Sequence, residues 1–430
     1  MVPGRQRRDS CHIMYMYMRF IVLLMALAVM APPAIAGGNL PTVYIETPGS
    51  EPVGSRDVWL PRCRVRIVAP DGIEVFETKT AEIKGRGHST FAKPKKPLAM
   101  RFGKRTPLLG MGAGKRWVLL ADFMDHSRLR NRLALAMARA TGMEWTPACR
   151  HVDVVVNGRP QGCYLLTEQV RVARGRVDID ERRGVLLEVD SYDDGDPRFL
   201  TAVRRLPVSV KSPSHPSAAM VDSVRRFLDG IEQNLYFPPK NGRFHIERYL
   251  VLGSFADWWL VNEAAQNAEP NGPRSCYLYR DGGGLLTAGP VWDFDLAFIT
   301  VGLDGDGNLR PARFSRPGAV RLTADSVYNR RALWYDRLLS DSSFVSLLSS
   351  RWQSLRPAWA ALADSIDCWR REIEPSALAD EALWRGQDPA RFDTCATFRS
   401  AVCHLRATYV SRLAAMDSIV AALRRGACGR

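Results

Sequence analysis

The stretch at residues 289–296 constrains this chain most, because it sets two carboxylates inside an apolar, aromatic run that holds no lysine or arginine. An unpaired carboxylate is costly to bury, so such a pair is usually offset by a cation, most often a metal ion. The apolar residues before the pair follow a glycine-rich turn at residues 281–284 and predict a strand. In a strand, Asp293 and Asp295 would face the same side and point at one cation. The alternative is that two aspartates at a strand end cap turns.

Residues 1–36 have the pattern of a secretory signal peptide. Four arginines precede an apolar run at residues 20–30, and a small-residue cleavage site follows at residues 34–36. A retained membrane anchor is the alternative, although the apolar run is short for a membrane span. We therefore expect an exported protein that is secreted, periplasmic or at the cell surface, with no stable membrane span after cleavage.

Charge and cysteine content narrow the class of partner. The formal net charge of +15 suits an anionic partner such as a nucleotide, a phosphorylated surface or an acidic polysaccharide, or simply a soluble, arginine-rich surface. Nucleic acid is not expected as a partner, because the basic residues are scattered and no nucleic-acid-binding motif is present. Eight cysteines follow residue 36, which permits disulfides, but none has the C-x-x-C spacing typical of a zinc site.

The first half of the chain has a β-rich pattern. Residues 41–80 alternate between apolar and polar side chains, and Asn157-Gly158 is a strong hairpin-turn signal. Residues 84–96 carry five cationic side chains and two glycines, the composition of a loop that covers phosphates, although an ordinary hairpin turn fits equally well. Glu168 and Glu188 sit at the ends of apolar strands, where each is either a solvated strand end or an anchor for a lysine.

The second half has a helical pattern. The predicted helix at residues 246–265 is largely apolar on all sides and is therefore expected to be buried. The break at residues 267–273 could bring Asn267 and Glu269 beside the two aspartates, and residues 330–426 are predicted to be helical. The fold class expected is thus α+β, with a β-rich N-terminal half and a helical C-terminal half. An acidic metal site that faces a basic segment is the arrangement that phosphoryl transfer needs.

Seven groups of short motifs follow one another between residues 80 and 300. They are KGRGHSTF at 84–91 with KKP at 95–97, WVLLA at 117–121 with LRN at 129–131, NG at 157–158 with GCYLLTE at 162–168, LEVD at 187–190, FAD at 255–257 with VNE at 261–263, SCYLY at 275–279, and PVWDFD at 290–295. Together, and in this order, they resemble the motifs of the spore-coat protein H (CotH) kinase-like family. His88 stands where that family usually has Asn, and Phe91 where it has Trp.

The resemblance implies an atypical protein-kinase-like, two-lobe fold that binds ATP and Mg²⁺ or Mn²⁺. It implies transfer of phosphate to Ser or Thr of a protein, here one of the cell surface or envelope. By motif position, Asp293 is assigned to the metal and to catalysis, Asp295 and Asn267 complete the metal site, and Glu269 falls where relatives carry a catalytic Asp. The nucleotide site is assigned to Lys84, Arg86 and Lys96, with Glu168 as a lysine partner.

The resemblance also leaves a choice between functions. Glu269 moves its carboxylate by one methylene relative to Asp, and a misplacement of about 1 Å can cost roughly a hundredfold in rate. The alternative is therefore a catalytically inactive kinase-fold protein with a structural or binding role in the envelope; a weaker third is a metal-dependent glycan-active protein. The predicted domains are a signal peptide at 1–36, a β segment at 37–80, a CotH kinase-like core at 81–300 and a helical region at 301–430 that packs on the core.

Overall fold

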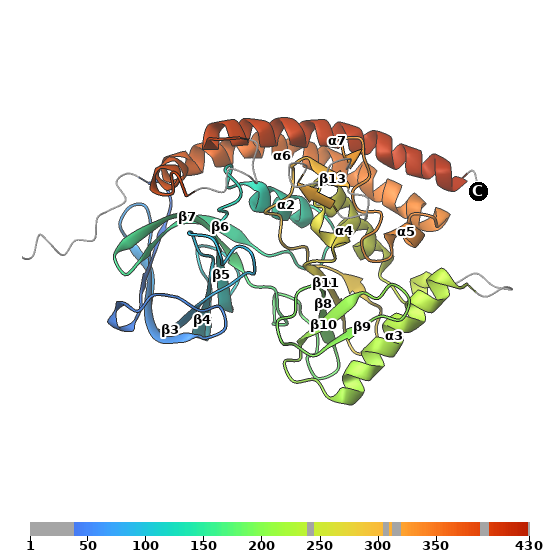
Figure 1. The fold of residues 1–430 in the computed structure, drawn as a ribbon, viewed down its shortest axis with the longest axis horizontal. Helices are drawn as coiled ribbons and strands as arrows, with labels where there is room; N and C mark the ends of the chain where they lie inside the picture. Colours follow the sequence, from blue (N-terminus) through green and yellow to red (C-terminus); the bar gives the residue numbers. More distant parts are fainter. Residues whose placement is uncertain (1–37, 239–244, 304–308, 312–319, 388–394, 429–430) are drawn as a thin grey trace, which may run out of the picture.

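The computed structural model describes residues 38–238, 245–303, 309–311, 320–387 and 395–428, so the predicted signal peptide lies outside the described residues. The α+β prediction is confirmed, because strands dominate the first half of the described chain and long helices the second (Figure 1). Among the residues described, no helix combines the length and apolar character needed to cross a membrane.

Seven strands of the N-terminal half form a closed barrel in the order β1-β2-β3-β4-β5-β7-β6. They are β1 (Thr42–Glu46), β2 (Leu60–Val68), β3 (Glu74–Gly85), β4 (Leu98–Thr106), β5 (Gly114–Leu120), β6 (Cys149–Val156) and β7 (Arg159–Glu168). Neighbouring strands are antiparallel except for β1 and β6, whose parallel pairing closes the barrel. Asn157 and Gly158 form the predicted tight turn between β6 and β7, both with positive φ. The boundary predicted at residue 80 falls inside β3, so residues 37–80 supply strands to the same barrel as the following segment.

A second, open sheet follows the barrel and has the order β12-β11-β8-β10-β9. Its strands are β8 (Val185–Val189), β9 (Arg198–Leu200), β10 (Pro207–Ser212), β11 (Cys276–Arg280) and β12 (Thr287–Ala288). Helix α3 (Ala218–Tyr236) lies beside β9 and β10 (Figure 1), and its buried Leu228 and Ile231 belong to the same core as Val208 of β10.

Helix α4 (Leu252–Ala264) lies at the centre of the second half. Every residue from Ser254 to Ala264 is buried, as its all-round apolar sequence predicts. Helix α2 (Arg130–Arg139) packs beside α4 through Leu133 and Met137, which share its core cluster. These helices carry the short segments that hold the carboxylates described below.

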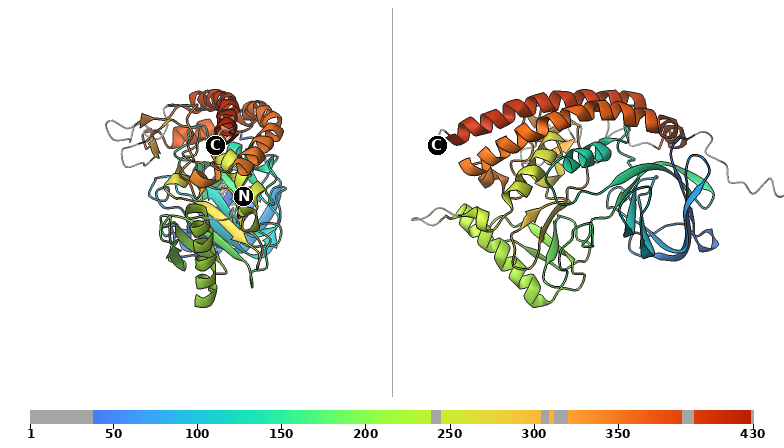
Figure 2. Two further views of the ribbon diagram at one scale, coloured as in Figure 1. Left: turned by 90° about the vertical axis from the view of Figure 1, so that its right-hand side faces the viewer. Right: turned by 180° about the vertical axis from the view of Figure 1, so that it is seen from behind.

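Two long C-terminal helices, α6 (Ser342–Leu383) and α7 (Phe398–Cys428), lie side by side and extend from the barrel along the second half (Figures 1 and 2). Asp380 of α6 is fully buried, and its carboxylate contacts Lys95 Nζ at 2.6 Å and the Arg128 guanidinium. Arg412 of α7 pairs with Glu263 of α4 at 2.6 Å, again without exposure. The helices are thus fixed by buried ion pairs as well as by apolar packing.

The seven cysteines whose side chains are described are all free thiols, so the disulfides that the composition permits are not formed among them.

Candidate active site

A cleft of about 550 Å³ lies between one wall of the barrel and the second sheet. Two kinds of side chain line it and form two groups. The carboxylates include Asp122, Glu188, Asp190, Glu269, Asp293 and Asp295, and the cations on the barrel side and in the linker that follows it include Lys84, Arg86, Arg116 and Arg171. The cleft therefore brings together the acidic pair and the start of the cationic segment, which are about two hundred residues apart in the sequence.

The segment that carries the aspartate pair is not the strand expected from its sequence. Strand β12 ends at Ala288, and Asp293 adopts a positive φ of 63°, which breaks any strand alternation. Asn131 of α2 fixes the segment instead: its amide oxygen accepts from Phe294 N at 2.9 Å, and its amide nitrogen donates to Asp295 Oδ1 at 2.5 Å. Both carboxylates reach one cleft because a distant helix holds their backbone, and not because side chains alternate.

Glu269 begins the short helix η3 (Glu269–Asn271) and lines the same cleft. Its carboxylate lies 3.5 Å from Arg274 Nη1. Burial, together with the negative charge of Asp293, raises the pKa of Glu269 to about 8. This carboxyl group is therefore a proton acceptor or donor near neutral pH, a property that fits a general base.

Asn267 does not line the cleft, although the sequence assigns it to the metal site. It is buried, its amide nitrogen donates to Asp293 O at 3.2 Å and to Asn262 Oδ1 at 3.1 Å, and its amide oxygen accepts from Glu269 N at 3.3 Å. Asn267 thus connects the backbones of the two segments that carry the carboxylates. Its side chain therefore positions those two segments.

Asp122, which the sequence analysis did not select, is a further acidic residue of the cleft. It follows β5 with a positive φ of 45°, and its side chain is buried. Asn131 donates to Asp122 Oδ1 at 2.9 Å, while Oδ2 has no hydrogen-bond partner among the described residues. Burial and the neighbouring Asp295 raise its pKa well above the usual range. Its position just after an apolar strand is the sequence signal that could have identified Asp122, because the same signal, an acidic residue at the end of an apolar strand, singled out Glu188.

The carboxylates of the cleft fit a divalent cation. Burial and the negative charge of Asp293 raise the pKa of Asp295 to about 7. Burial also raises the pKa of Asp293, and the positive charge of Arg86 opposes that rise. A hard cation such as Mg²⁺ would reduce the repulsion among these carboxylates and would give the unpaired, buried Oδ2 of Asp122 a partner. No group of three or more His, Cys, Asp or Glu side chains within the described ranges forms a complete metal cage. A partial set suits Mg²⁺, which often uses one or two carboxylates together with phosphate oxygens and water.

The predicted nucleotide residues separate into two groups. Lys84 and Arg86 line the cleft, and the Arg86 guanidinium lies 5.5 Å from the centre of the Trp292 ring. Lys96 instead closes its own turn, since Nζ donates to Phe91 O at 2.8 Å and to Lys93 O at 3.3 Å. The structure therefore gives Lys96 a local structural role outside the lining of the cleft.

Glu168 is placed apart from the cleft as well. Its carboxylate accepts from Ala148 N at 2.9 Å and lies 3.7 Å from Arg176 Nε, so its cationic neighbour is an arginine and not the expected lysine. Glu188 is the strand-end glutamate that meets a lysine: Oε2 lies 3.3 Å from Lys211 Nζ, and both residues line the cleft.

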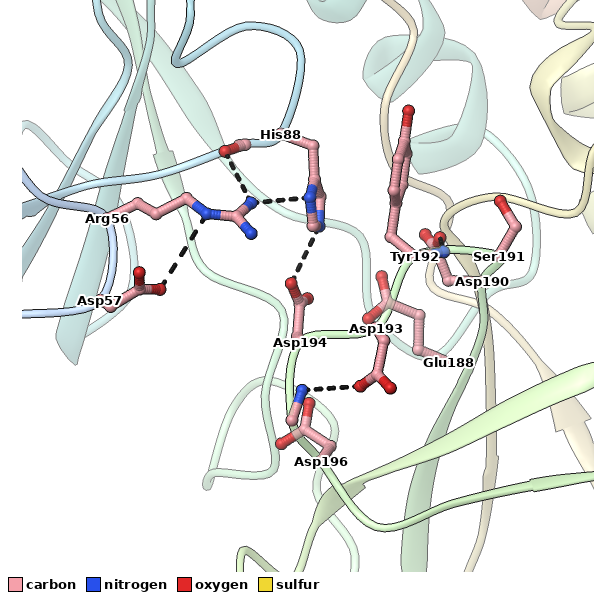
Figure 3. Close-up of polar contacts among 12 residues, drawn as sticks. Arg56, Asp57, His88, Glu188, Asp190, Ser191, Tyr192, Asp193, Asp194 and Asp196 are labelled. Atoms are coloured by element: carbon pink, nitrogen blue, oxygen red, sulfur yellow. Dashed lines mark hydrogen bonds and ion pairs between the residues drawn. The ribbon is translucent and has the colours of Figure 1, made fainter.

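Four residues form a contact across the cleft, which we call the His88 clasp: Arg56, His88, Tyr192 and Asp194 (Figure 3). The His88 ring stacks on Tyr192 with centroids 4.1 Å apart, and Nε2 lies 2.8 Å from Asp194 Oδ1. Arg56 Nη1 donates to His88 Nδ1 at 2.6 Å. The turn after β3 is thereby connected to the loop between β8 and β9, so the clasp joins the barrel to the second sheet.

Comparison with known proteins adds a family assignment to this geometry. No curated protein matches the chain. The model of the CotH kinase protein family matches residues 83–416, which begin near the end of β3 and extend into α7, well beyond the boundary predicted at residue 300. Because this match covers most of the sequence and includes both walls of the cleft, the chain belongs to the CotH kinase protein family.

Proposed function

We propose that this protein is an exported, CotH-like atypical protein kinase that transfers the γ-phosphate of ATP to Ser or Thr of a cell-surface or envelope protein. The observation that carries the proposal is the convergence of Asp293, Asp295 and Glu269 with Lys84 and Arg86 on one cleft. The family assignment supports kinase-like chemistry. The barrel and the helix-backed second sheet, with the cleft between them, correspond on this proposal to the two lobes of a kinase-like fold.

The cleft has walls suited to both parts of a nucleotide. Leu120, Val170 and Leu186 line it and offer apolar surface for a purine base. Lys84 and Arg86 supply positive charge for the phosphates, and both approach from the end of β3. This combination of an apolar wall and adjacent cations favours a nucleoside triphosphate over inorganic phosphate alone.

In the proposed mechanism, Asp293 and Asp295 hold Mg²⁺ or Mn²⁺, which when bound neutralises the charge of the phosphates. Arg86, which lies near Asp293 and opposes the rise in its pKa, orients the γ-phosphate from the barrel side. Glu269 accepts the proton of the acceptor hydroxyl as that oxygen bonds to the γ-phosphorus and the bond from phosphorus to the ADP oxygen breaks. Its pKa of about 8 makes the carboxylate a stronger base than an exposed glutamate.

A second function is favoured by one observation at the same residue. Arg274 pairs with Glu269, and the longer side chain places the carboxylate differently from an Asp. A protein that binds ATP and metal in this cleft without transferring phosphate would serve as a binding or structural component of the envelope.

The test is transfer of ³²P from γ-labelled ATP in the presence of Mg²⁺ or Mn²⁺, to the protein itself and to an envelope extract. Asp293→Ala removes the proposed metal ligand, and Asp364→Ala, an exposed aspartate on α6, serves as the matched control. We expect labelling with the wild type and with the control, and its loss with Asp293→Ala. Equal labelling with all three proteins would contradict the assigned site. ATP binding without labelling would favour the non-catalytic function.

A further inference from the structure

One part of the cleft concentrates positive charge beside a tryptophan. Three cationic side chains, those of Lys84, Arg101 and Arg116, lie over the indole of Trp59, and Arg171 lines the cleft near Arg116. We call Trp59 and these four residues the Trp59 cluster. Lys84 Nζ lies 5.2 Å from the ring centre, Arg101 Cζ 4.8 Å and Arg116 Cζ 5.5 Å. Arg171 is close enough to Arg116 to repel its charge. All five except Arg101 line the cleft.

Among the described residues, Arg101 is the one cation of the cluster that forms an ion pair, while Asp57 and Asp194 act on Lys84 from a greater distance. Glu82 forms a two-nitrogen hydrogen bond with Arg101 and is thereby satisfied. Lys84, Arg116 and Arg171 form no ion pair with any residue that the structure describes. Partial burial and the repulsion from Arg171 and Arg101 lower the pKa of Arg116 to about 10, and burial lowers the pKa of Lys84. Cations held together in this way gain most from a bound anion.

The cluster is distinct from the group that surrounds the carboxylates. Arg86 packs over Trp292 and interacts electrostatically with Asp293 and Asp295. Lys84 lies in β3, whereas Arg86 follows the end of that strand at Gly85. Burial is the main cause of the lowered pKa of Arg116, and the charged groups that act on it are Arg171, Arg101 and Glu82.

From this arrangement we infer that the Trp59 cluster is a subsite for an acidic side chain of the acceptor, a carboxylate or a phosphorylated residue that flanks the Ser or Thr to be modified. The inference rests on the proposed kinase function for the role of the acceptor. Arginine guanidinium groups bind carboxylate and phosphate with paired hydrogen bonds, and the half-buried position of Arg116 and Arg171 strengthens such contacts. On the proposed function, Lys84, Arg86 and the metal serve the nucleotide phosphates, which leaves Arg116 and Arg171 for the acceptor.

The experiment measures binding of fluorescent peptides to the full chain by anisotropy. Three peptides share one serine, which is flanked by glutamate, by glutamine or by phosphoserine. We expect the glutamate and phosphoserine peptides to bind and the glutamine peptide to bind at least tenfold more weakly, roughly the effect of losing one charge-assisted contact. The binding of the acidic peptides is also expected to fall steeply with salt.

The variant Arg116→Gln/Arg171→Gln tests the residues. We expect it to weaken acidic-peptide binding by roughly tenfold or more while the thermal shift produced by ATP with Mg²⁺ stays unchanged. The matched control is Arg225→Gln/Arg226→Gln, which removes the same charge from exposed positions of α3 and should leave peptide binding unchanged.

Three outcomes overturn the inference: equal binding of the acidic and glutamine peptides by the wild type, loss of ATP binding instead of peptide binding in the cluster variant, or preference for an acidic polysaccharide over the acidic peptides. The salt dependence of the wild type provides a test even if the variant does not fold. If the acidic peptides bind in a way that depends on Arg116 and Arg171 but no ³²P is transferred, the subsite is supported and only the kinase proposal is contradicted. The two proposals can therefore fail separately.

Discussion

Single residues decide whether this cleft accepts a metal. One asparagine, Asn131, holds the carboxylates of Asp122 and Asp295 and the backbone of Phe294. A second, Asn267, connects Asp293 to Glu269. The acidic groups are therefore kept close together although they repel one another, and burial together with this repulsion raises the pKa of both Asp295 and Glu269. A bound cation would reduce this electrostatic repulsion.

The pKa values of this group predict how stability depends on pH. Asp295 and Glu269 have folded-state pKa values of about 7 and about 8, above the ordinary values of 3.8 and 4.5. A group with a raised folded-state pKa contributes stability that is complete below its unfolded pKa and is lost as the pH rises through the folded value. The metal-free protein should therefore lose stability as the pH rises from about 4 to about 8, because the two carboxyl groups ionise in the unfolded chain before they ionise in the cleft.

Bound Mg²⁺ should reverse that loss, because it favours the ionised carboxylates. We expect the increase in Tm that Mg²⁺ produces to be larger at pH 8.5 than at pH 6, as measured by differential scanning fluorimetry. Asp295→Asn should reduce this pH-dependent part, whereas Asp364→Ala should not. The same gain in Tm at both pH values would show that the cleft carboxylates do not take up the metal.

At the residue scale, the sequence identified the acidic pair but not the reason for its position. The apolar run before Asp293 has the composition of a strand, yet the positive φ of Asp293 depends on contacts with α2 and with Asn267. These partners lie far away in the sequence, so no local pattern contains them. Glu168 is similar, because the backbone amide that it accepts from belongs to Ala148, twenty residues away. Lys96 differs: its partners Phe91 and Lys93 are local, but they are backbone carbonyls and leave no sequence signal.

At the scale of elements, the barrel and the second sheet are joined across the cleft by the His88 clasp. Arg56 can only donate, so the nitrogen of His88 that faces it accepts and the opposite nitrogen donates to Asp194. The charged groups around the clasp are Arg56, Asp57, Asp194, Lys211, which lies 3.6 Å from Asp194, and Arg274, which lies over Tyr192. The clasp thus connects a turn to a loop without a backbone hydrogen bond between them.

Removing the clasp should loosen the two segments and leave the rest of the fold intact. For His88→Ala we expect amide hydrogen exchange at residues 86–91 and 190–196 to become roughly fivefold faster, since losing such contacts lowers the local opening free energy by about 1 kcal/mol. His404→Ala, an exposed histidine on α7, is the control for hydrogen–deuterium exchange mass spectrometry. Unchanged hydrogen exchange in both segments would mean that contacts other than the His88 clasp hold them together.

Hairpins were predictable at this scale because their signals are local, as at Asn157 and Gly158. The closure of the barrel was not, because β1 and β6 are paired in parallel and lie about a hundred residues apart. Similarly, nothing in the local sequence of Asp380, near the C-terminal end of α6, indicates that its carboxylate will pair with Lys95 of the barrel half.

At the scale of the molecule, α6 and α7 act as a brace that holds the two halves around the cleft (Figure 2). Asp380 accepts from Cys163 N of β7 at 3.0 Å and pairs with the fully buried Lys95, while Arg412 fixes α7 to α4. The family match includes both helices up to residue 416, in agreement with their role as part of the fold and not as an appendage.

Breaking this brace should destabilise the whole protein. Asp380→Ala leaves Lys95 and Arg128 buried without their anion, for which we expect a loss of about 3–5 kcal/mol in the free energy of unfolding in urea. Asp364→Ala on the same helix, whose side chain is 89% exposed, should cost less than about 0.5 kcal/mol. Equal stabilities of the two variants would contradict a structural role for the buried pair.

The central claim is that the cleft between barrel and sheet is a metal-dependent ATP site centred on Asp293. Isothermal titration calorimetry of ATP with the full chain, with Mg²⁺ or with EDTA, tests it most directly. We predict binding by the wild type only when Mg²⁺ is present, and its loss in Asp293→Ala while Asp364→Ala retains it. ATP binding that needs no metal, or that persists unchanged in Asp293→Ala, would contradict the claim.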